Sequence, residues 1–176
     1  ALWARQQVSR LTGEVSRLMT ENIEKARMTK ELETAKAIQE TLFPVNDFTA
    51  GALEISGYYE PASECGGDWW HYFESAGKIY VLIGDATGHG VPAALITSAI
   101  RAATSLVETE PTMPPERMME KLNWAVCACA KNQIQMTLFL GVFDCEKKSL
   151  TYVSASHEPG LLARENKAGG KLQFEN

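Results

Sequence analysis

The first 43 residues contain no proline and only one glycine, Gly13. Proline and glycine are the residues that most strongly disfavour a helix interior, so their near absence predicts one long helix. Nowhere does the chain hold an apolar run of the roughly 18–20 residues that a membrane-spanning helix needs. Its first residues also lack the basic segment and apolar core of a secretory signal. We therefore expect a cytoplasmic location without direct membrane contact, either alone or as the output domain of a membrane-bound receptor.

Cysteine is scarce as well. The chain has four cysteines, at positions 65, 127, 129 and 145, and none of them forms a Cys-x-x-Cys pair. This spacing argues against a structural zinc site. Cys127 and Cys129 lie in an apolar stretch, so we expect them to be buried free thiols, as suits a reducing compartment.

The chain has no basic stripe. Residues 1–44 carry seven Lys or Arg against six Asp or Glu, and the remainder carries ten against sixteen. An acidic domain without clustered positive charge argues against nucleic acid as a partner.

Apolar residues of the first segment recur with the alternating three- and four-residue spacing of a coiled-coil seam. The seam residues are Val8, Leu11, Val15 and Leu18, then the polar Asn22 and Lys25, and then Met28, Leu32, Ala35, Gln39 and Leu42. The step from Lys25 to Met28 is a stammer, which overwinds the supercoil locally. We predict a coiled-coil or linker helix over residues 1–43 that stops at Pro44 and forms a parallel homodimer through residues 5–40. The alternative is a helix that folds back onto its own domain, and we favour such packing for residues 30–43.

Residues 44–176 have the pattern of an α+β domain. Strands are predicted at 53–59, 68–73, 78–84, 136–143, 149–154, 161–164 and, after a turn at Gly169-Gly170, at 171–174; helices are predicted at 91–108 and 115–130. Because hairpins outnumber helical crossovers, we expect a layered antiparallel arrangement rather than a doubly wound parallel sheet.

Two aspartates lie among glycines beside residues that favour strands. Asp68 follows Gly66-Gly67, and Asp85 stands in the turn Gly-Asp-Ala-Thr-Gly-His-Gly. Since strands 68–73 and 78–84 form a hairpin, both carboxylates should lie at the same end of neighbouring strands. They could then share a hard divalent cation, which prefers oxygen ligands. His89 lies in the same turn, so the cluster is typical of a hydrolytic centre.

Asp85 also has simpler interpretations. An aspartate before a helix often caps that helix, and the amides of a glycine turn can cradle phosphate. Nucleotide binding is the weaker alternative, because the turn lacks the lysine and the spacing of a P-loop. His89 has an alternative role too, as a residue hydrogen-bonded within its turn.

Several linked motifs together resemble one family. They are Glu-Cys-Gly-Gly-Asp-Trp-Trp at 64–70, Ile-Gly-Asp-Ala-Thr-Gly-His-Gly-Val-Pro-Ala-Ala-Leu at 83–95, the helix at 32–44, and the strand segments at 136–144 and 150–162. Over about residues 30–165 the chain is similar to the bacterial PPM-type metal-dependent serine/threonine phosphatases of the SpoIIE/RsbU branch. The resemblance implies a layered α-β-β-α sandwich of antiparallel sheets.

The resemblance also implies an activity and a site. Family members hydrolyse phosphoserine or phosphothreonine with two Mn²⁺ or Mg²⁺ ions, which activate water and offset phosphoryl charge. By correspondence, Asp85 is the bridging metal ligand, the carbonyl of Ala86 is a second contact, and Asp68 is the other acidic ligand. His89 would protonate the leaving oxygen or orient water. The expected substrate is a small phosphoprotein, an anti-sigma-factor antagonist, and the expected regulator is an upstream sensor domain.

The sequence departs from the family pattern in ways that affect the site. His71 stands where relatives carry a second acid, so a group behind the metal ligands should be altered. The family's other metal aspartates lie beyond the end of this sequence, and Asp144 is expected to be a hairpin-turn residue. We therefore expect residues 44–176 to be a phosphatase domain without its C-terminal part, holding half a metal site. Such a chain should bind metal weakly and turn over poorly or not at all. His157 is interpreted as a structural turn residue, and the alternative is that it touches the site.

These departures keep a second hypothesis open. The chain could be a non-catalytic dimerisation or signal-transmitting module, such as a pseudophosphatase. Metal binding at Asp85 would distinguish the two, because a scaffold has no need of it.

Overall fold

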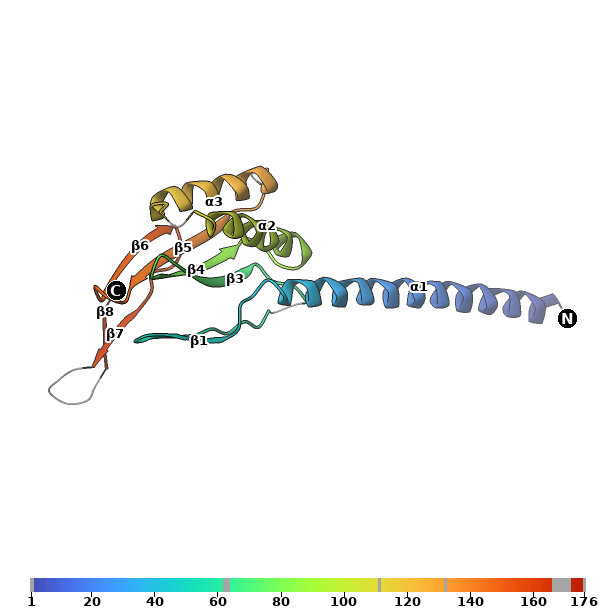
Figure 1. The fold of residues 1–176 in the computed structure, drawn as a ribbon. Coiled ribbons are helices and arrows are strands. Elements are labelled where there is room, and N and C mark those ends of the chain that lie inside the picture. Colours follow the sequence, from blue (N-terminus) through green and yellow to red (C-terminus); the bar gives the residue numbers. More distant parts are fainter. Residues whose placement is uncertain (1, 62–63, 111, 132, 166–171, 176) are drawn as a thin grey trace.

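A computed structural model describes residues 2–61, 64–110, 112–131, 133–165 and 172–175. It shows one long helix, α1 (Leu2–Glu40), that projects from a layered body of strands and two shorter helices (Figure 1). In the described part of the chain, no helix combines the length and apolarity needed to cross a membrane.

The elements of the body follow the predicted order closely. They are β1 (Asp47–Ala50), β2 (Leu53–Ser56), β3 (Asp68–Ser75), β4 (Lys78–Ala86), α2 (Val91–Val107), α3 (Pro115–Ala130), β5 (Met136–Asp144), β6 (Ser149–Ala155), β7 (Leu162–Glu165) and β8 (Leu172–Glu175). The sequence patterns missed β1, a four-residue strand whose one partner among the described strands is β2. The predicted turn at Gly169-Gly170 lies outside the described residues.

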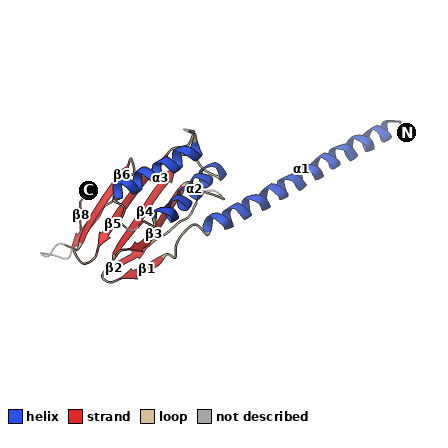
Figure 2. Cartoon of the chain, turned by 45° about the horizontal axis from the view of Figure 1, so that its top comes forward, coloured by secondary structure: helices blue, strands red, loops and turns tan. Residues whose placement is uncertain are grey.

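The main sheet is antiparallel, with strand order β3-β4-β5-β6. Helices α2 and α3 cover one face of this sheet (Figure 2). Alternate strand residues point into that interface, where the largest fully buried side chains are Trp69, Leu82, Leu140, Ile100, Met118 and Leu122. The expected antiparallel α+β architecture is confirmed.

The β1–β2 hairpin lies against the other face of the sheet. Phe48 of β1 stacks on Tyr72 of β3, with ring centroids 4.6 Å apart. The ring of Trp70 packs so closely on Gly57 that a Cβ at position 57 would lie 2.1 Å from it. The described residues therefore supply one helical layer, the main sheet and a two-stranded part of a second β layer.

The end of α1 packs on the body, whereas its first three quarters do not. Residues 8–31 are all exposed, while Leu32, Ala35 and Leu42 are half-buried and Gln39 is buried. The helix then tightens through a bond from the Thr41 amide to the Ile38 carbonyl before Pro44. The predicted packing of residues 30–43 is thus confirmed, and the helix before it does not fold back.

The cysteines of α3 contradict the sequence-based expectation. Cys127 and Cys129 are exposed, because α3 turns its other side to the sheet and buries Met118, Met119, Leu122, Val126 and Ala130. Apolar composition alone did not reveal which side of this helix faces solvent.

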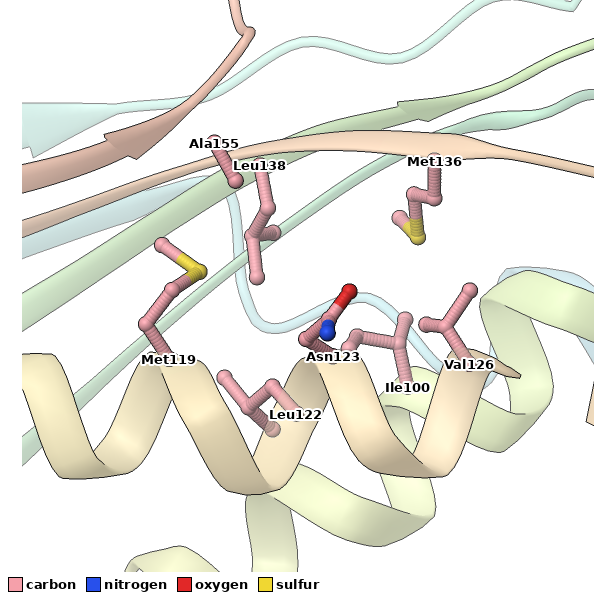
Figure 3. Close-up of a pocket in the computed structure, with 8 residues that line it drawn as sticks. All are labelled: Ile100, Met119, Leu122, Asn123, Val126, Met136, Leu138 and Ala155. Carbon is pink, nitrogen blue, oxygen red and sulfur yellow. The ribbon is translucent and has the colours of Figure 1, made fainter. Parts of the chain in front are cut away.

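A small cavity lies between α3 and the sheet (Figure 3). Its volume is about 20 Å³, and it is lined by Ile100, Met119, Leu122, Asn123, Val126, Met136, Leu138 and Ala155. That volume has room for about one water molecule. It belongs to the core, so a substrate site has to be sought elsewhere.

Candidate functional site

The β3–β4 hairpin brings Asp68 and Asp85 together. Its turn consists of Ala76 and Gly77, both with positive φ (51° and 72°), as a two-residue hairpin turn matched to strand twist requires. Pairing then runs from Ser75 opposite Lys78 to Asp68 directly opposite Asp85. Directly opposite residues share a face and have Cβ atoms about 4.5–5.5 Å apart. The predicted proximity of the two aspartates is confirmed.

This pair lies on the sheet face away from α2 and α3. Ala86, the next residue along β4, is buried in the core on the helical side, so Asp85 points to the opposite side. Both aspartate side chains are exposed. Burial nonetheless raises the pKa of Asp85, the charge of Asp68 raises it further, and His157 lowers it. The two carboxylates therefore repel each other, and a cation between them would relieve that repulsion.

The two glycine turns interlock beside the aspartates. The Ala86 amide donates to the Gly67 carbonyl at 3.0 Å, and the Gly90 amide donates to the Cys65 carbonyl at 3.1 Å. A Cβ on Gly67 would lie 2.3 Å from the carbonyl oxygen of Ala86. Only glycine allows this approach, which holds the Ala86 carbonyl beside the residue that precedes Asp68.

The helix-cap alternative for Asp85 is not adopted. Gly90 is the N-cap residue of α2, with φ of 73°, and no side chain caps the helix. His89 is exposed in the same turn. Within the described residues no hydrogen bond holds its imidazole, so the alternative of a hydrogen-bonded turn histidine is not supported either.

His157, for which the sequence favoured a turn role over contact with the site, lies at this site. Thr137 of β5 is paired directly with Asp85, and its Oγ1 lies 2.8 Å from Nδ1 of His157. The row Asp68, Asp85 and Thr137 therefore continues to His157 across the sheet end. Sequence spacing alone gave no signal of this; the register of β5 with β6 creates it.

His71 does not lie behind Asp68 and Asp85, so the expectation of an altered group behind them was wrong. It is three residues from Asp68 and faces the helices instead. Its Nε2 lies 2.9 Å from Oε1 of Glu108, which is 3.2 Å from Nη1 of Arg101. Burial and the Arg101 charge lower the pKa of His71, and Glu108 opposes them.

Asp144 is a turn residue, as predicted. Its carboxylate accepts a hydrogen bond from the Lys147 amide at 2.9 Å. It is paired with Lys78, at the opposite end of β4 from Asp85.

An open groove adjoins the aspartates. It has a volume of about 390 Å³ and is lined by Tyr58, Tyr59, Glu60, Asp68, Trp69, Trp70, Ile83, Gly84 and His157. In the part of the chain that the structure describes, no group of three or more His, Cys, Asp or Glu is close enough to hold a metal ion. The described site thus offers two carboxylates and a nearby backbone carbonyl.

Known proteins are similar to this chain in sequence and in fold. The family model described as Stage II sporulation protein E (SpoIIE) matches residues 75–174. Phosphoserine phosphatase RsbU of Bacillus subtilis (strain 168) is 34% identical over 132 residues, which cover 74% of this chain and 39% of RsbU. Phosphoserine phosphatase RsbP of the same organism is 28% identical over 141 residues, covering 75% of this chain and 34% of RsbP.

A solved structure confirms the fold. The SiaA-PP2C domain of Pseudomonas aeruginosa superposes with a TM-score of 0.61 at 23% sequence identity, over 74% of this chain and 54% of that one. The chain spans about two fifths of RsbU and one third of RsbP. Because the family model covers more than half of its residues, the chain belongs to the SpoIIE family.

Proposed function

We propose that this chain forms part of a metal-dependent protein serine/threonine phosphatase. Its substrate is a small phosphoprotein, an anti-sigma-factor antagonist, and its ions are Mn²⁺ or Mg²⁺. The observation that carries the proposal is the direct pairing of Asp68 with Asp85 at one sheet end. Membership of a family whose relatives include two phosphoserine phosphatases supports it.

The residues present fit a divalent cation. Asp68 and Asp85 would supply carboxylate oxygens and Ala86 a carbonyl oxygen, the hard donors that Mg²⁺ and Mn²⁺ prefer. The raised pKa of Asp85, caused by burial and by Asp68, is the electrostatic mark of a site that lacks positive charge. When bound, the ions supply a Lewis acid for the phosphoryl oxygens and lower the pKa of water.

His89 is the proposed proton donor of the reaction. It stands four residues after Asp85 between Gly88 and Gly90, both with positive φ, and its side chain is exposed. Imidazole is the side chain that enzymes use most often as a general acid, which suits proton transfer to the leaving seryl oxygen. Its freedom from hydrogen bonds within the described residues leaves both ring nitrogens available.

Regulation is proposed to pass through α1. The Gln39 side chain donates to the Gly66 carbonyl at 2.7 Å and to Thr97 Oγ1 at 3.0 Å, and it accepts from the Gly66 amide at 3.2 Å. It therefore joins the helix to the turn before Asp68 and to α2. A homodimer through residues 5–40, driven by an upstream sensor, would move this joint and with it the aspartate pair.

Metal binding tests the proposal. Calorimetric titration with Mn²⁺ should show binding by the wild-type chain and none by Asp85→Ala. Asp144→Ala is the matched control, since that aspartate lies at the opposite strand end and should leave binding unchanged. Release of phosphate from a phosphoserine peptide is measured on the same samples.

A non-catalytic signal-transmitting module is the second candidate. It is favoured by the small number of acidic ligands among the described residues. If wild type and Asp85→Ala give the same titration with Mn²⁺, the phosphatase proposal is overturned in favour of this module.

A further inference from the structure

His157 has no part in the function proposed above, yet its position is tightly determined. It follows Ser156, a non-glycine residue with φ of 56°, and the Ser154 hydroxyl donates to the His157 carbonyl at 3.3 Å. A left-handed backbone at serine costs about 1–2 kcal/mol and persists only where the surroundings hold it. The turn therefore holds the imidazole in one place.

The orientation of the ring is set from β5. Nδ1 of His157 lies 2.8 Å from Thr137 Oγ1, and Thr137 is the direct strand partner of Asp85. If the threonine hydroxyl donates to Nδ1, the ring proton sits on Nε2. The free Nε2–H then becomes a donor beside the aspartate pair.

The charges that line the groove suggest what this Nε2–H donor binds. Among the residues that line the groove, His157 has the one basic side chain, while Asp68 and Glu60 are acidic. A phosphorylated side chain that enters the groove is repelled by those carboxylates. The imidazole of His157 can donate to a phosphoryl oxygen without depending on an ion, and it is the groove donor that adjoins the Asp85 strand partner, Thr137.

We propose that His157 contacts the phosphorylated substrate, with its Nε2–H donating a hydrogen bond to an oxygen of the phosphomonoester. Thr137 is the positioning residue that keeps the proton on Nε2. The inference rests on the proposed phosphatase function and assigns the recognition of the phosphoryl group within that site. It involves no covalent step.

Phosphate binding is the first test. The full chain, labelled with ¹⁵N-histidine, is titrated with inorganic phosphate in the presence of Mg²⁺. The His157 Nε2 resonance should shift on saturation, and phosphate affinity should fall about tenfold in His157→Leu, as expected for loss of a hydrogen bond to a charged group. His157→Gln keeps a donor at similar reach and should recover part of the affinity.

Thr137→Val tests the positioning role separately and guards against a misfolded His157 variant. It removes only the hydroxyl, so the Nε2 signal should broaden or move toward the other tautomer and phosphate affinity should fall by about threefold or more. Glu158→Gln, one residue further along the same turn, is the matched control and should behave as wild type.

Turnover of a phosphoserine peptide gives a second readout. Loss of a contact made equally in the ground and transition states raises KM and leaves kcat unchanged, so His157→Leu should raise KM about tenfold. Mg²⁺ binding by calorimetry separates the two proposals. A wild-type chain that binds no metal overturns the phosphatase, whereas normal metal binding with the same phosphate affinity and KM in His157→Leu overturns only the role of His157. Absence of any Nε2 shift in the wild type also overturns it.

Discussion

At the residue scale, the candidate site works against the stability of the fold. Asp68 and Asp85 are held opposite each other by strand register, and like charges directly opposite each other on a sheet are destabilising. Proteins retain such a destabilising pair when the function of the site requires both carboxylates. This cost gives the site a stability signature that is independent of catalysis.

The first prediction concerns Asp85→Asn. The change removes the charge that burial and Asp68 disfavour, so the metal-free variant should melt at a higher temperature than wild type at pH 7. Saturating Mn²⁺ should make wild type melt at the higher temperature. An ion at one hundred times its Kd stabilises the protein that binds it by about 2.7 kcal/mol, and the variant lacks the Asp85 carboxylate that would bind the ion. Calorimetric melting with and without the ion measures both. A lower melting temperature for metal-free Asp85→Asn would contradict the account.

The second prediction concerns His71 and pH. Burial and Arg101 hold the pKa of His71 below its ordinary value, so the unfolded chain takes up a proton more readily than the folded one. Stability from this residue is complete above its unfolded pKa of about 6.5 and is lost as the pH falls below it, by at most about 1.4 kcal/mol per pH unit. Urea unfolding of His71→Gln at pH 7.5 and 5.0 should show a smaller loss than wild type. The exposed His89→Gln serves as control and should keep the wild-type loss.

At the element scale, α1 changes its surroundings along its length. Its seam is solvent-exposed through Leu18 and Met28, and after the stammer the same spacing places Leu32, Ala35 and Gln39 against the body. One periodic pattern thus serves two surfaces. Gln39 is where the helix meets the glycine turn of the site.

The third prediction tests this joint with Gln39→Met, which keeps the volume and removes the hydrogen bonds. The variant leaves buried partners at Gly66 and Thr97 without Gln39, so the free energy of unfolding should fall by about 1–3 kcal/mol. Because Gly66 precedes the aspartate turn, Mn²⁺ affinity should fall too. Urea unfolding and calorimetry measure the two effects. Ile38→Met, at an exposed neighbouring position, should change neither the free energy of unfolding nor the Mn²⁺ affinity. An unchanged Mn²⁺ affinity in Gln39→Met would show that α1 does not influence the site.

At the scale of the whole molecule, the body and α1 differ in how far their apolar side chains are buried. The body has its own core, in which Ile100 and Leu122 are completely buried. The helix has no comparable cover: Val8, Leu11 and Val15 are each more than half exposed. An isolated helix with an apolar seam is poorly stable in water and gains most from a partner.

The fourth prediction follows for assembly. The double variant Val15→Lys with Leu18→Lys puts charges on the seam and should shift sedimentation equilibrium from dimer to monomer. Met19→Lys makes the same kind of change one position off the seam and should leave the dimer intact. A wild-type chain that sediments as a monomer at high micromolar concentration would contradict the proposed homodimer.

Much of this protein was predictable from local pattern. The long helix, the β3–β4 hairpin and the neighbourhood of Asp68 and Asp85 followed from helix periodicity, turn residues and strand alternation, all of which act over a few residues. Strand β1 was not predicted because it has four residues and pairs with one strand among those described. The exposure of Cys127 and Cys129 was not predicted, because both residues are apolar enough to suit either side of α3.

The sequence by itself determined the hairpin of strands 68–73 and 78–84, and therefore that Asp68 and Asp85 lie at the same end of neighbouring strands. Their direct pairing comes from the two-residue turn at Ala76 and Gly77 that the structure shows. Only the tertiary structure decided that His157 joins them and that His71 does not. His157 follows β6, which forms a hairpin with β5, and it reaches the site because β5 pairs with β4, a contact between segments far apart in the sequence. His71 turns toward Glu108 and Arg101 because the helices pack on that face of the sheet, and such packing depends on the whole core.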